Sequence, residues 1–174
     1  MERQFKEMKF SISFIKLVLI SLLMGSLTGC SQPENFNQMV LEVTDQTIPF
    51  TYVKELQDHE VLMLDARDEA EFEVSHIKGA KRIGYTDFDQ SILNGVSKDS
   101  EIVVYCSVGY RSEKIAEKIQ DLGYTNVRNL FGGIFAWKNA GYEVVNRKGV
   151  TEKVHAYNED WGRWLFEGEK VYEK

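Results

Sequence analysis

The chain contains few prolines, cysteines and histidines: two, two and three among its 174 residues. Proline is rare, glycine is only moderately frequent, and no internal repeat or low-complexity tract is present, so a long disordered segment is not indicated. Hydrophobic residues make up 43% of the chain and charged residues 28%, which is ordinary for one globular domain with a sizeable core.

Acidic residues outnumber basic ones in most of the chain. The formal net charge is −6, although residues 1–29 carry four basic side chains against two acidic ones. The rest of the chain therefore has a net charge of −8. Such an acidic body argues against a nucleic-acid partner, because nucleic acids are bound through basic surfaces.

The chain also lacks an apolar run of the roughly 20 residues that cross a bilayer. A basic start is followed by a shorter, mostly apolar stretch over residues 14–27, and this stretch ends at Leu27-Thr28-Gly29-Cys30. The order is typical of a signal peptide over residues 1–29, and its end resembles the bacterial lipobox. The resemblance implies cleavage before Cys30, lipid attachment to Cys30, and an exported, membrane-anchored lipoprotein on the periplasmic or cell-surface side. The alternative is an N-terminal anchor helix that is not cleaved.

If Cys30 carries lipid, Cys106 is the one free thiol of an exported protein and no intramolecular disulfide can form. Cys106 ends the apolar run over residues 102–105, and a short glycine-containing loop follows it. A helical pattern then opens at Arg111 and stops at Gly123, with apolar residues three and four positions apart. The sequence therefore predicts a strand, a tight loop and a helix, with the sulfur at the sheet edge where open α/β folds bind ligands.

The predicted loop has a definite chemistry. Its amides and those of the first helical turn converge on the loop mouth, where the helix dipole adds positive potential. We therefore expect Cys106 to be held largely as a thiolate, in a loop suited to an anionic sulfur species or a small oxyanion. The alternative is that Cys106 is a small buried core residue without a chemical role.

Short apolar strands alternate with helical segments in the rest of the chain. Strands are predicted near residues 47–51, 61–65, 80–83, 102–105 and 127–130, and helices near 52–56, 68–74, 87–93, 111–122 and 134–140. This alternation predicts an α/β fold with about five strands in a mostly parallel sheet flanked by helices. A polar, irregular tether is expected over residues 30–46, the domain over 47–147, and an extension packed on the domain over 148–174.

Two groups of motifs resemble the signatures of rhodanese domains. The first is Asp65-x-Arg67-x-x-x-Glu71-Phe72-x-x-Ser75-His76-Ile77-x-Gly79-Ala80. The second is Tyr105-Cys106-x-x-Gly109-x-Arg111-Ser112, followed by Gly123-Tyr124-x-Asn126-Val127, Leu130-x-Gly132-Gly133 and Ala136-Trp137-x-x-Ala140-Gly141. The match covers about residues 47–146 and departs at Ser75, where the family usually has glycine, so we expect that turn to differ locally.

The resemblance implies a three-layer α/β/α fold and a sulfurtransferase. Such an enzyme moves a sulfane sulfur from thiosulfate, a persulfide or a polysulfide to a thiol or cyanide-like acceptor through a persulfide on Cys106. Cys106 is then the nucleophile, and the following loop residues bind the substrate, their amides hydrogen-bonding the persulfide anion: Ser107, Val108, Gly109, Tyr110 and Arg111. We expect neither a cofactor nor a metal ion, and we leave a periplasmic protein partner open.

Other matched residues have less direct roles. Arg111 either binds the donor's anionic group or pins the loop to a carboxylate. Asp65 and Arg67 are expected to form a structural ion pair. His76 is expected to be a structural hydrogen-bonding residue rather than a base, since a thiolate stabilised by amides needs none. The glycine pair at residues 132–133 is expected to permit close chain packing.

Two other functions remain alternatives. Cysteine phosphatases use Cys-x5-Arg, whereas four residues separate Cys106 from Arg111, so a phosphatase or arsenate reductase is the weaker one. The other is a rhodanese-fold module that carries sulfur or senses redox state without turnover, although no second cysteine lies near the loop. Because Arg111 is the only charged loop residue, we expect modest activity with the thiosulfate dianion and better use of persulfides or polysulfides.

The extension has an aromatic cluster of its own. Trp161, Trp164 and Leu165 lie at helical spacing together with Phe166, and Asn158 or Asp160 can cap the helix. We expect a short helix docked on the domain, because exposed tryptophans are costly. The alternative is that this segment borders the Cys106 mouth and shapes donor access, with His155 taking part.

Overall fold

The structure is a computed structural model that describes residues 35–56 and 61–172. The chain divides into two compact units, Met1–Gln32 and Pro33–Lys174, and the described residues all belong to the second. The predicted signal peptide and the predicted lipidation site at Cys30 lie outside the described residues. Within residues 35–56 and 61–172, no helix has the length and apolar character needed to cross a membrane.

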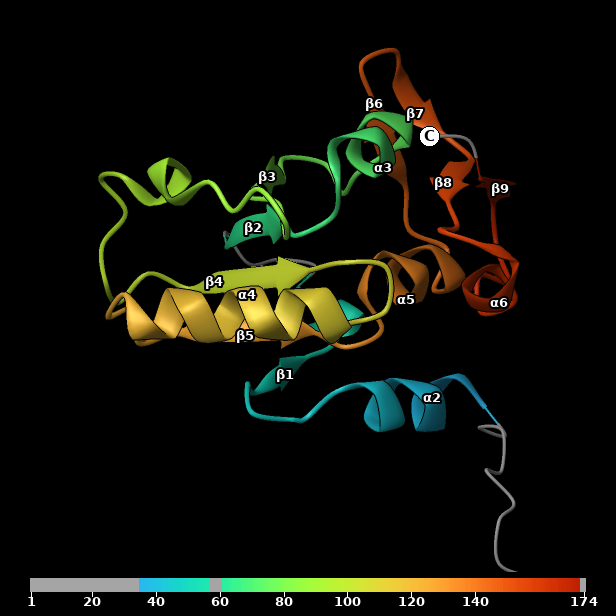
Figure 1. Ribbon diagram of the computed structural model, residues 1–174. Helices are drawn as coiled ribbons and strands as arrows, with labels where there is room; N and C mark the ends of the chain where they lie inside the picture. The colour runs from blue at the N-terminus through green and yellow to red at the C-terminus, as the bar shows by residue number, and fades with distance from the viewer. Residues whose placement is uncertain (1–34, 57–60, 173–174) are drawn as a thin grey trace, which may run out of the picture. The chain divides into compact units, whose positions relative to one another are not determined.

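A five-stranded parallel sheet is the centre of the domain (Figure 1). Its strands, in spatial order, are β1 (Phe50–Thr51), β5 (Val127–Leu130), β4 (Ile102–Tyr105), β2 (Leu62–Asp65) and β3 (Lys81–Arg82). β4 is the middle strand, and all four of its residues are buried. A continuous apolar run is what a parallel strand covered on both faces requires. The predicted α/β fold with a parallel sheet is confirmed.

Helices cover both faces of the sheet. They are η1 (Val53–Glu55), α3 (Glu69–Val74), η2 (Gln90–Leu93), α4 (Tyr110–Asp121) and α5 (Gly133–Asn139). Val104 of β4 packs in one core cluster with Ile115 and Ile119 of α4, which runs alongside β4 and β5 in Figure 1. Val103 faces the opposite way and packs in a second cluster with Phe135 of α5. Alternate strand residues thus serve opposite layers, and Cys106 belongs to the α4 side.

The irregular tether predicted over residues 30–46 is wrong for residues 36–43, because these form the helix α2 (Phe36–Val43). Asn35 caps this helix by accepting a 3.0 Å hydrogen bond from the amide of Gln38. Met39 and Val40 are buried in the same core cluster as α5. Asn37 and Glu42 of this helix are exposed while Met39 and Val40 are buried, so the helix is amphipathic.

A buried carboxylate fixes the chain between α2 and β1. Glu113 of α4 accepts hydrogen bonds from the amides of Asp45 and Thr47, each at 2.8 Å. Glu113 is buried in the first turn of α4, close to the loop that follows Cys106. The N-terminal helix is therefore held against the domain at the end where the cysteine lies.

The extension forms several short elements. They are β7 (Gly149–Thr151), which pairs antiparallel with β6 (Val144–Asn146) just before the extension, β8 (Lys153–His155) paired parallel with β9 (Glu169–Val171), and α6 (Glu159–Gly162). α6 begins after the predicted cap Asn158, whose side chain accepts a 3.0 Å hydrogen bond from the Trp161 amide. Trp164 and Leu165 are buried as expected, but Phe166 is 63% exposed. The β-strands of the extension were not predicted.

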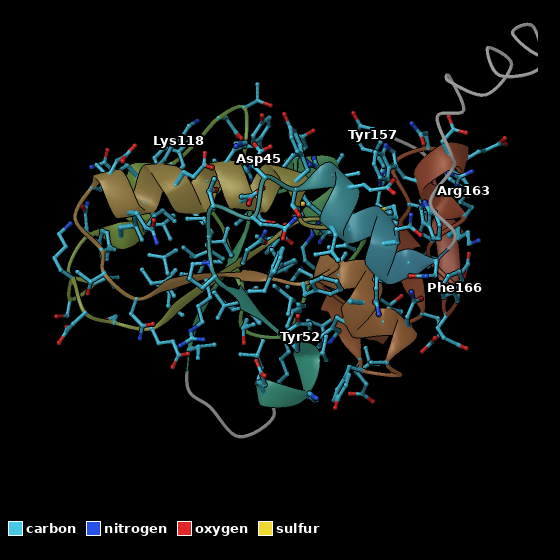
Figure 2. All side chains as sticks on the ribbon, turned by 90° about the horizontal axis from the view of Figure 1, so that it is seen from below. Asp45, Tyr52, Lys118, Tyr157, Arg163 and Phe166 are labelled. Carbon is cyan, nitrogen blue, oxygen red and sulfur yellow. The ribbon has the colours of Figure 1, made fainter. Side chains whose placement is uncertain are left out.

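The two flanking segments meet each other. The ring of Phe36 in α2 lies 6.4 Å from that of Trp164 and 6.2 Å from that of Phe166, measured between ring centroids. Figure 2 labels Phe166 at the end of the domain where α2 lies. The helix α2, which precedes the sheet, therefore contacts the extension, which follows it, at one end of the domain.

Candidate active site

The backbone of Cys106 is positioned by α5. The amide of Ile134 donates to the carbonyl oxygen of Cys106 at 2.9 Å, and the amide of Phe135 donates to that of Ser107 at 3.2 Å. Gly133 makes this approach possible, because a β-carbon there would lie 2.2 Å from the Cys106 carbonyl oxygen. A β-carbon on Gly132 would lie 2.5 Å from the ring of Phe36. The close packing predicted for this glycine pair is confirmed.

Of the loop amides predicted to converge on the sulfur, that of Gly109 contacts it. The N–H of Gly109 points at Cys106 Sγ with an N···S distance of 3.1 Å. Gly109 has φ +124°, a conformation that favours glycine, and this turn brings the amide to the sulfur. An amide donor stabilises negative charge on the sulfur and on a second sulfur attached to it.

Side chains of α4 and β5 hold the turn from behind. The carbonyl oxygen of Gly109 accepts from Asn129 Nδ2 at 2.9 Å. Ser112 Oγ lies 2.7 Å from Asn129 Oδ1, 3.0 Å from the Gly109 carbonyl oxygen and 3.5 Å from Cys106 Sγ. The single hydroxyl proton can serve one acceptor at a time, so Ser112 can turn from Asn129 to the sulfur when charge develops there. The sequence pattern predicts no role for either residue.

Cys106 is only 1% exposed, but it is not sealed in the core. Its side chain lines an open cavity of about 560 Å³. Most of the other lining side chains are apolar or aromatic: Val43, Asp68, Tyr85, Thr86, Ser107, Val108, Tyr110, Arg111, Tyr157 and Trp161. The cavity gives a small molecule access to the sulfur, so the structure does not favour an inert core cysteine.

Arg111 braces the loop. Its guanidinium forms a fork on Glu71, with N···O distances of 2.6 and 2.8 Å, and also donates to Ser107 Oγ at 3.0 Å. Asp68 lies 3.7 Å away, and the ring of Tyr157 lies 5.4 Å from the guanidinium carbon. Burial acts against the charged form, but the hydrogen bonds and charge of Glu71 outweigh it and raise the pKa of Arg111. Of the two roles considered for Arg111, this geometry supports the pin to a carboxylate.

Glu71 is the carboxylate that this brace requires. It is 3% exposed, and it also accepts hydrogen bonds from Ser107 Oγ at 3.2 Å and from the Asp68 amide at 3.1 Å. Burial acts to raise the pKa of Glu71, but the hydrogen bonds and charge of Arg111 hold it below its ordinary value. The sequence signal was the spacing Asp68-x-x-Glu71, a capping box at the start of α3, which does not reveal the contact with the loop.

Asp65 and Arg67 form the expected ion pair. Arg67 Nη2 lies 2.7 Å from Asp65 Oδ2 and 2.7 Å from the carbonyl oxygen of Ser75, and both charged side chains are fully buried. Burial opposes the charge of Arg67, but Asp65 more than offsets this and raises its pKa. Ser75 has φ −171°, an extended conformation that any residue adopts, so glycine is not needed there.

His76 stays away from the sulfur's cavity. Its Nδ1 lies 3.0 Å from the carbonyl oxygen of Phe72, its ring stacks on that of Phe72 at 3.9 Å, and its backbone bridges Val145. The Phe72 carbonyl can only accept, so this contact places a proton on Nδ1. This environment agrees with a structural role for His76.

The flanking segments supply part of the cavity wall. Val43 comes from α2, and Tyr157 and Trp161 come from the extension. Tyr157 is labelled in Figure 2 on the side where α2 lies. The extension therefore borders the Cys106 mouth, as one interpretation of the sequence held. His155 does not, because it lines a separate cavity of about 390 Å³ beside Glu71.

The fold and the cysteine loop together define the class of protein. The model of the rhodanese-like domain matches residues 50–140, and this chain belongs to that family. The resemblance found in the motifs is thereby confirmed. Both α2 and the extension lie outside the matched residues.

The chain is also similar to several curated proteins. The tRNA uridine(34) hydroxylase of Listeria monocytogenes is 34% identical over 118 residues, which is 63% of this chain and 36% of that protein. The protein of the same name from Bdellovibrio bacteriovorus is 35% identical over 82 residues, covering 45% of this chain and 23% of its own length. The chain thus spans about a third or less of these curated relatives.

Solved structures show the same fold. The thiosulfate sulfurtransferase of Pseudomonas aeruginosa superposes with a TM-score of 0.54 at 20% identity, over 75% of this chain and 25% of that one. The rhodanese-like domain of an Anabaena protein gives a TM-score of 0.51 at 23% identity, over 56% and 79%. At such identities the likeness concerns the fold alone.

Proposed function

We propose that this protein is a rhodanese-type sulfurtransferase that works through a persulfide on Cys106. The observation that carries the proposal is the sulfur's position at the wall of an open cavity, with the Gly109 amide 3.1 Å away. The Cys106 thiolate attacks the outer sulfur of a donor, the donor's S–S bond breaks, and the donor leaves as its anion. The extra sulfur stays on Cys106 as an amide-stabilised persulfide until an acceptor thiolate or cyanide removes it.

The charge around the cavity supports organic persulfides or polysulfides, which carry less negative charge, as donors rather than the thiosulfate dianion. Among the described lining residues, the charged side chains are Arg111 and Asp68. Arg111 is already neutralised by Glu71. A dianion therefore meets no net positive charge there, and thiosulfate is expected to be a modest donor.

We infer from the lipobox-like Leu27-Thr28-Gly29-Cys30 that the domain is exported and held at a membrane by lipid on Cys30. An acceptor thiol or a protein partner would then meet it outside the cytoplasm. We propose no tRNA substrate, because a formal net charge of −6 opposes binding to a phosphate backbone.

The test uses the full chain with Cys30→Ser, so that Cys106 is the only thiol present. Intact mass is measured after incubation with polysulfide or thiosulfate, and again after addition of cyanide. The expected result is a gain of one sulfur atom, its loss to cyanide, and repeated release of thiocyanate. The control Cys30→Ser/Cys106→Ser should gain nothing.

Loading without repeated turnover would instead make the protein a sulfur carrier or sensor. Failure of Cys106 to gain sulfur from either donor would overturn both functions.

A further inference from the structure

We propose that the cavity beside Cys106 contains a subsite for the organic group of the sulfur donor, so that the preferred donors carry an apolar or aromatic group on the sulfane sulfur. The inference rests on the proposed sulfurtransferase function and specifies its substrate class. It assigns Tyr157, Val43 and Trp161, which lie outside the family's matched residues, as specificity-determining residues.

The size of the cavity is the first observation. A volume of about 560 Å³ is within the range of pockets that hold small organic molecules. A single transferred sulfur needs only the loop around Gly109. The remaining space has no use for a donor as small as thiosulfate, but it suits a donor with a larger leaving group.

The walls are the second observation. Val108 from the loop and Tyr85 from the chain after β3 face the same cavity as Val43, Tyr157 and Trp161. Aromatic and aliphatic side chains favour a planar apolar group, because they bury its surface and stack on its face. Their convergence from separate parts of the chain encloses the cavity on several sides.

The electrostatics point the same way. Arg111 forms its fork on Glu71 at 2.6 and 2.8 Å, and the half-exposed Asp68 lies 3.7 Å from it. These three groups carry a net charge of −1. Recognition of the donor must therefore come mainly from contact with its organic part.

Tyr157 is built into this wall by its backbone. It has φ +66°, which is uncommon for a residue other than glycine. Its amide donates to His155 Nδ1 at 3.2 Å, and its ring lies over Arg111, although its side chain is half exposed. Backbone strain of this kind is retained where the side chain has a positional task. Here the task is to hold the ring over the mouth of the cavity.

Two stable donors test the subsite: benzenethiosulfonate and methanethiosulfonate. Both are monoanions of the form R–SO₂–S⁻, so they differ in the organic group and not in charge. The Cys106 thiolate takes the outer sulfur, the S–S bond breaks, and the sulfinate R–SO₂⁻ leaves. Cyanide then removes the sulfur as thiocyanate, which is measured to give kcat/KM for each donor.

The quantity compared is the ratio of kcat/KM for the aromatic donor to that for the methyl donor. Intrinsic reactivity differs between the donors, but it cancels when the same ratio is compared between proteins. We expect the wild-type ratio to exceed those of the cavity variants by about 5-fold or more, as loss of apolar contacts predicts. The variants are Tyr157→Gly, which suits a positive φ and removes the ring, and Val43→Trp, which fills the cavity. Tyr52→Ala is the matched control, because it removes an exposed aromatic ring that neither lines the cavity nor touches α2 or the extension, and its ratio should stay within about 2-fold of wild type.

The outcomes separate the subsite from the underlying function. Unchanged ratios in both cavity variants, with active proteins, would overturn the subsite and leave sulfur transfer standing. An equal loss with both donors would also overturn it, because that result means a disturbed loop. If the wild-type protein loads no sulfur from either donor, the proposed function fails and the subsite fails with it.

Discussion

Replacing Glu71 by Gln isolates the brace between α3 and the cysteine loop. The change keeps the size of the side chain and one acceptor oxygen, but it removes the charge that faces Arg111. The guanidinium would then remain in a mostly buried position, with Asp68 at 3.7 Å as a more distant carboxylate. The cavity would gain one unit of positive charge.

The expected cost to stability is substantial. Removing one partner of a buried ion pair typically costs about 3–5 kcal/mol. Arg111 keeps some contact with solvent and Gln still accepts a hydrogen bond, so we expect about 2–4 kcal/mol in the free energy of unfolding. Glu73→Gln is the matched control on the same helix. Its partner Arg147 is largely exposed, so this change should cost less than about 1 kcal/mol.

The pH dependence gives an independent check. The pKa of Glu71 is held below its ordinary value of 4.5 in the folded protein. A depressed carboxyl pKa contributes stability that is present above the unfolded-state pKa and is lost as the pH falls through the folded-state pKa. The stability gap between wild type and Glu71→Gln should therefore be constant from pH 7 to about pH 5 and narrow below about pH 4.5. Urea denaturation at each pH measures it.

The same substitution should improve the use of thiosulfate. Coulomb's law gives roughly 1–2 kcal/mol for a unit charge about 7 Å from a dianion at an effective dielectric constant of about 40–80. Removing the negative charge of Glu71 from beside the cavity is expected to have an effect of this order. That corresponds to a rise in kcat/KM of about 5- to 30-fold at low salt, declining as salt is added. If Glu71→Gln proves as stable as Glu73→Gln and uses thiosulfate no better than wild type, Arg111 is not neutralised by Glu71 in the way described.

Three further changes test the framework around the sulfur. Gly133→Ala should destabilise the protein by about 2 kcal/mol or more and slow alkylation of Cys106, because the new methyl group would collide with the carbonyl oxygen of Cys106. Thermal unfolding measures the loss of stability, and thiol labelling measures the alkylation rate. Met39→Ala should cost about 2–4 kcal/mol in urea denaturation if α2 is part of the core, whereas a change near zero would mean an undocked helix. Ser112→Ala should reduce the rate of sulfur loading, measured by stopped flow, by about 3- to 30-fold. Its free energy of unfolding should fall by only about 1–2 kcal/mol, through the lost contact with Asn129. An unchanged loading rate would mean that the hydroxyl does not turn to the sulfur.

The unit from β4 to α4 could be predicted from the sequence because its determinants are local. The apolar run before Cys106 forms a buried strand, and the spacing from Ile115 to Ile119 fixes the buried face of the helix. Gly109 and Gly133 have positive φ, a conformation that favours glycine, so a glycine at each position indicates a close turn in the sequence. Motifs in the right order then gave the family, which the match over residues 50–140 confirms.

A pin from Arg111 to a carboxylate and an extension at the Cys106 mouth were both alternatives from the sequence. The carboxylate itself, Glu71, and the other cavity walls could not be predicted, because they depend on contacts between distant residues. Glu71 and Arg111 are 40 residues apart, and Glu113 holds a segment 66 and 68 residues earlier in the chain. No periodicity records such pairs. The helix α2 has two buried residues, Met39 and Val40, within a polar stretch. Two such residues are too few to show a helical period, so the sequence suggested a tether. In the extension, the short strands have three residues each, too few for a clear alternating pattern.

The separation between the cysteine loop and its walls bears on how donor choice is set. The loop, Glu71 and Arg111 lie within residues 50–140, whereas Val43, Tyr157 and Trp161 lie outside them. The sulfur's immediate surroundings therefore lie within the residues that match the family, whereas three of the eleven residues that line the cavity do not. Two rhodanese-like domains with the same loop can then differ in the donor they accept, because the organic group contacts flanking segments that family membership does not specify. In this chain, the ring contact between Phe36 and Trp164 holds α2 and the extension together. We therefore expect substitutions of these two residues to change the ratio of kcat/KM between donors more than they change the rate of sulfur transfer at Cys106.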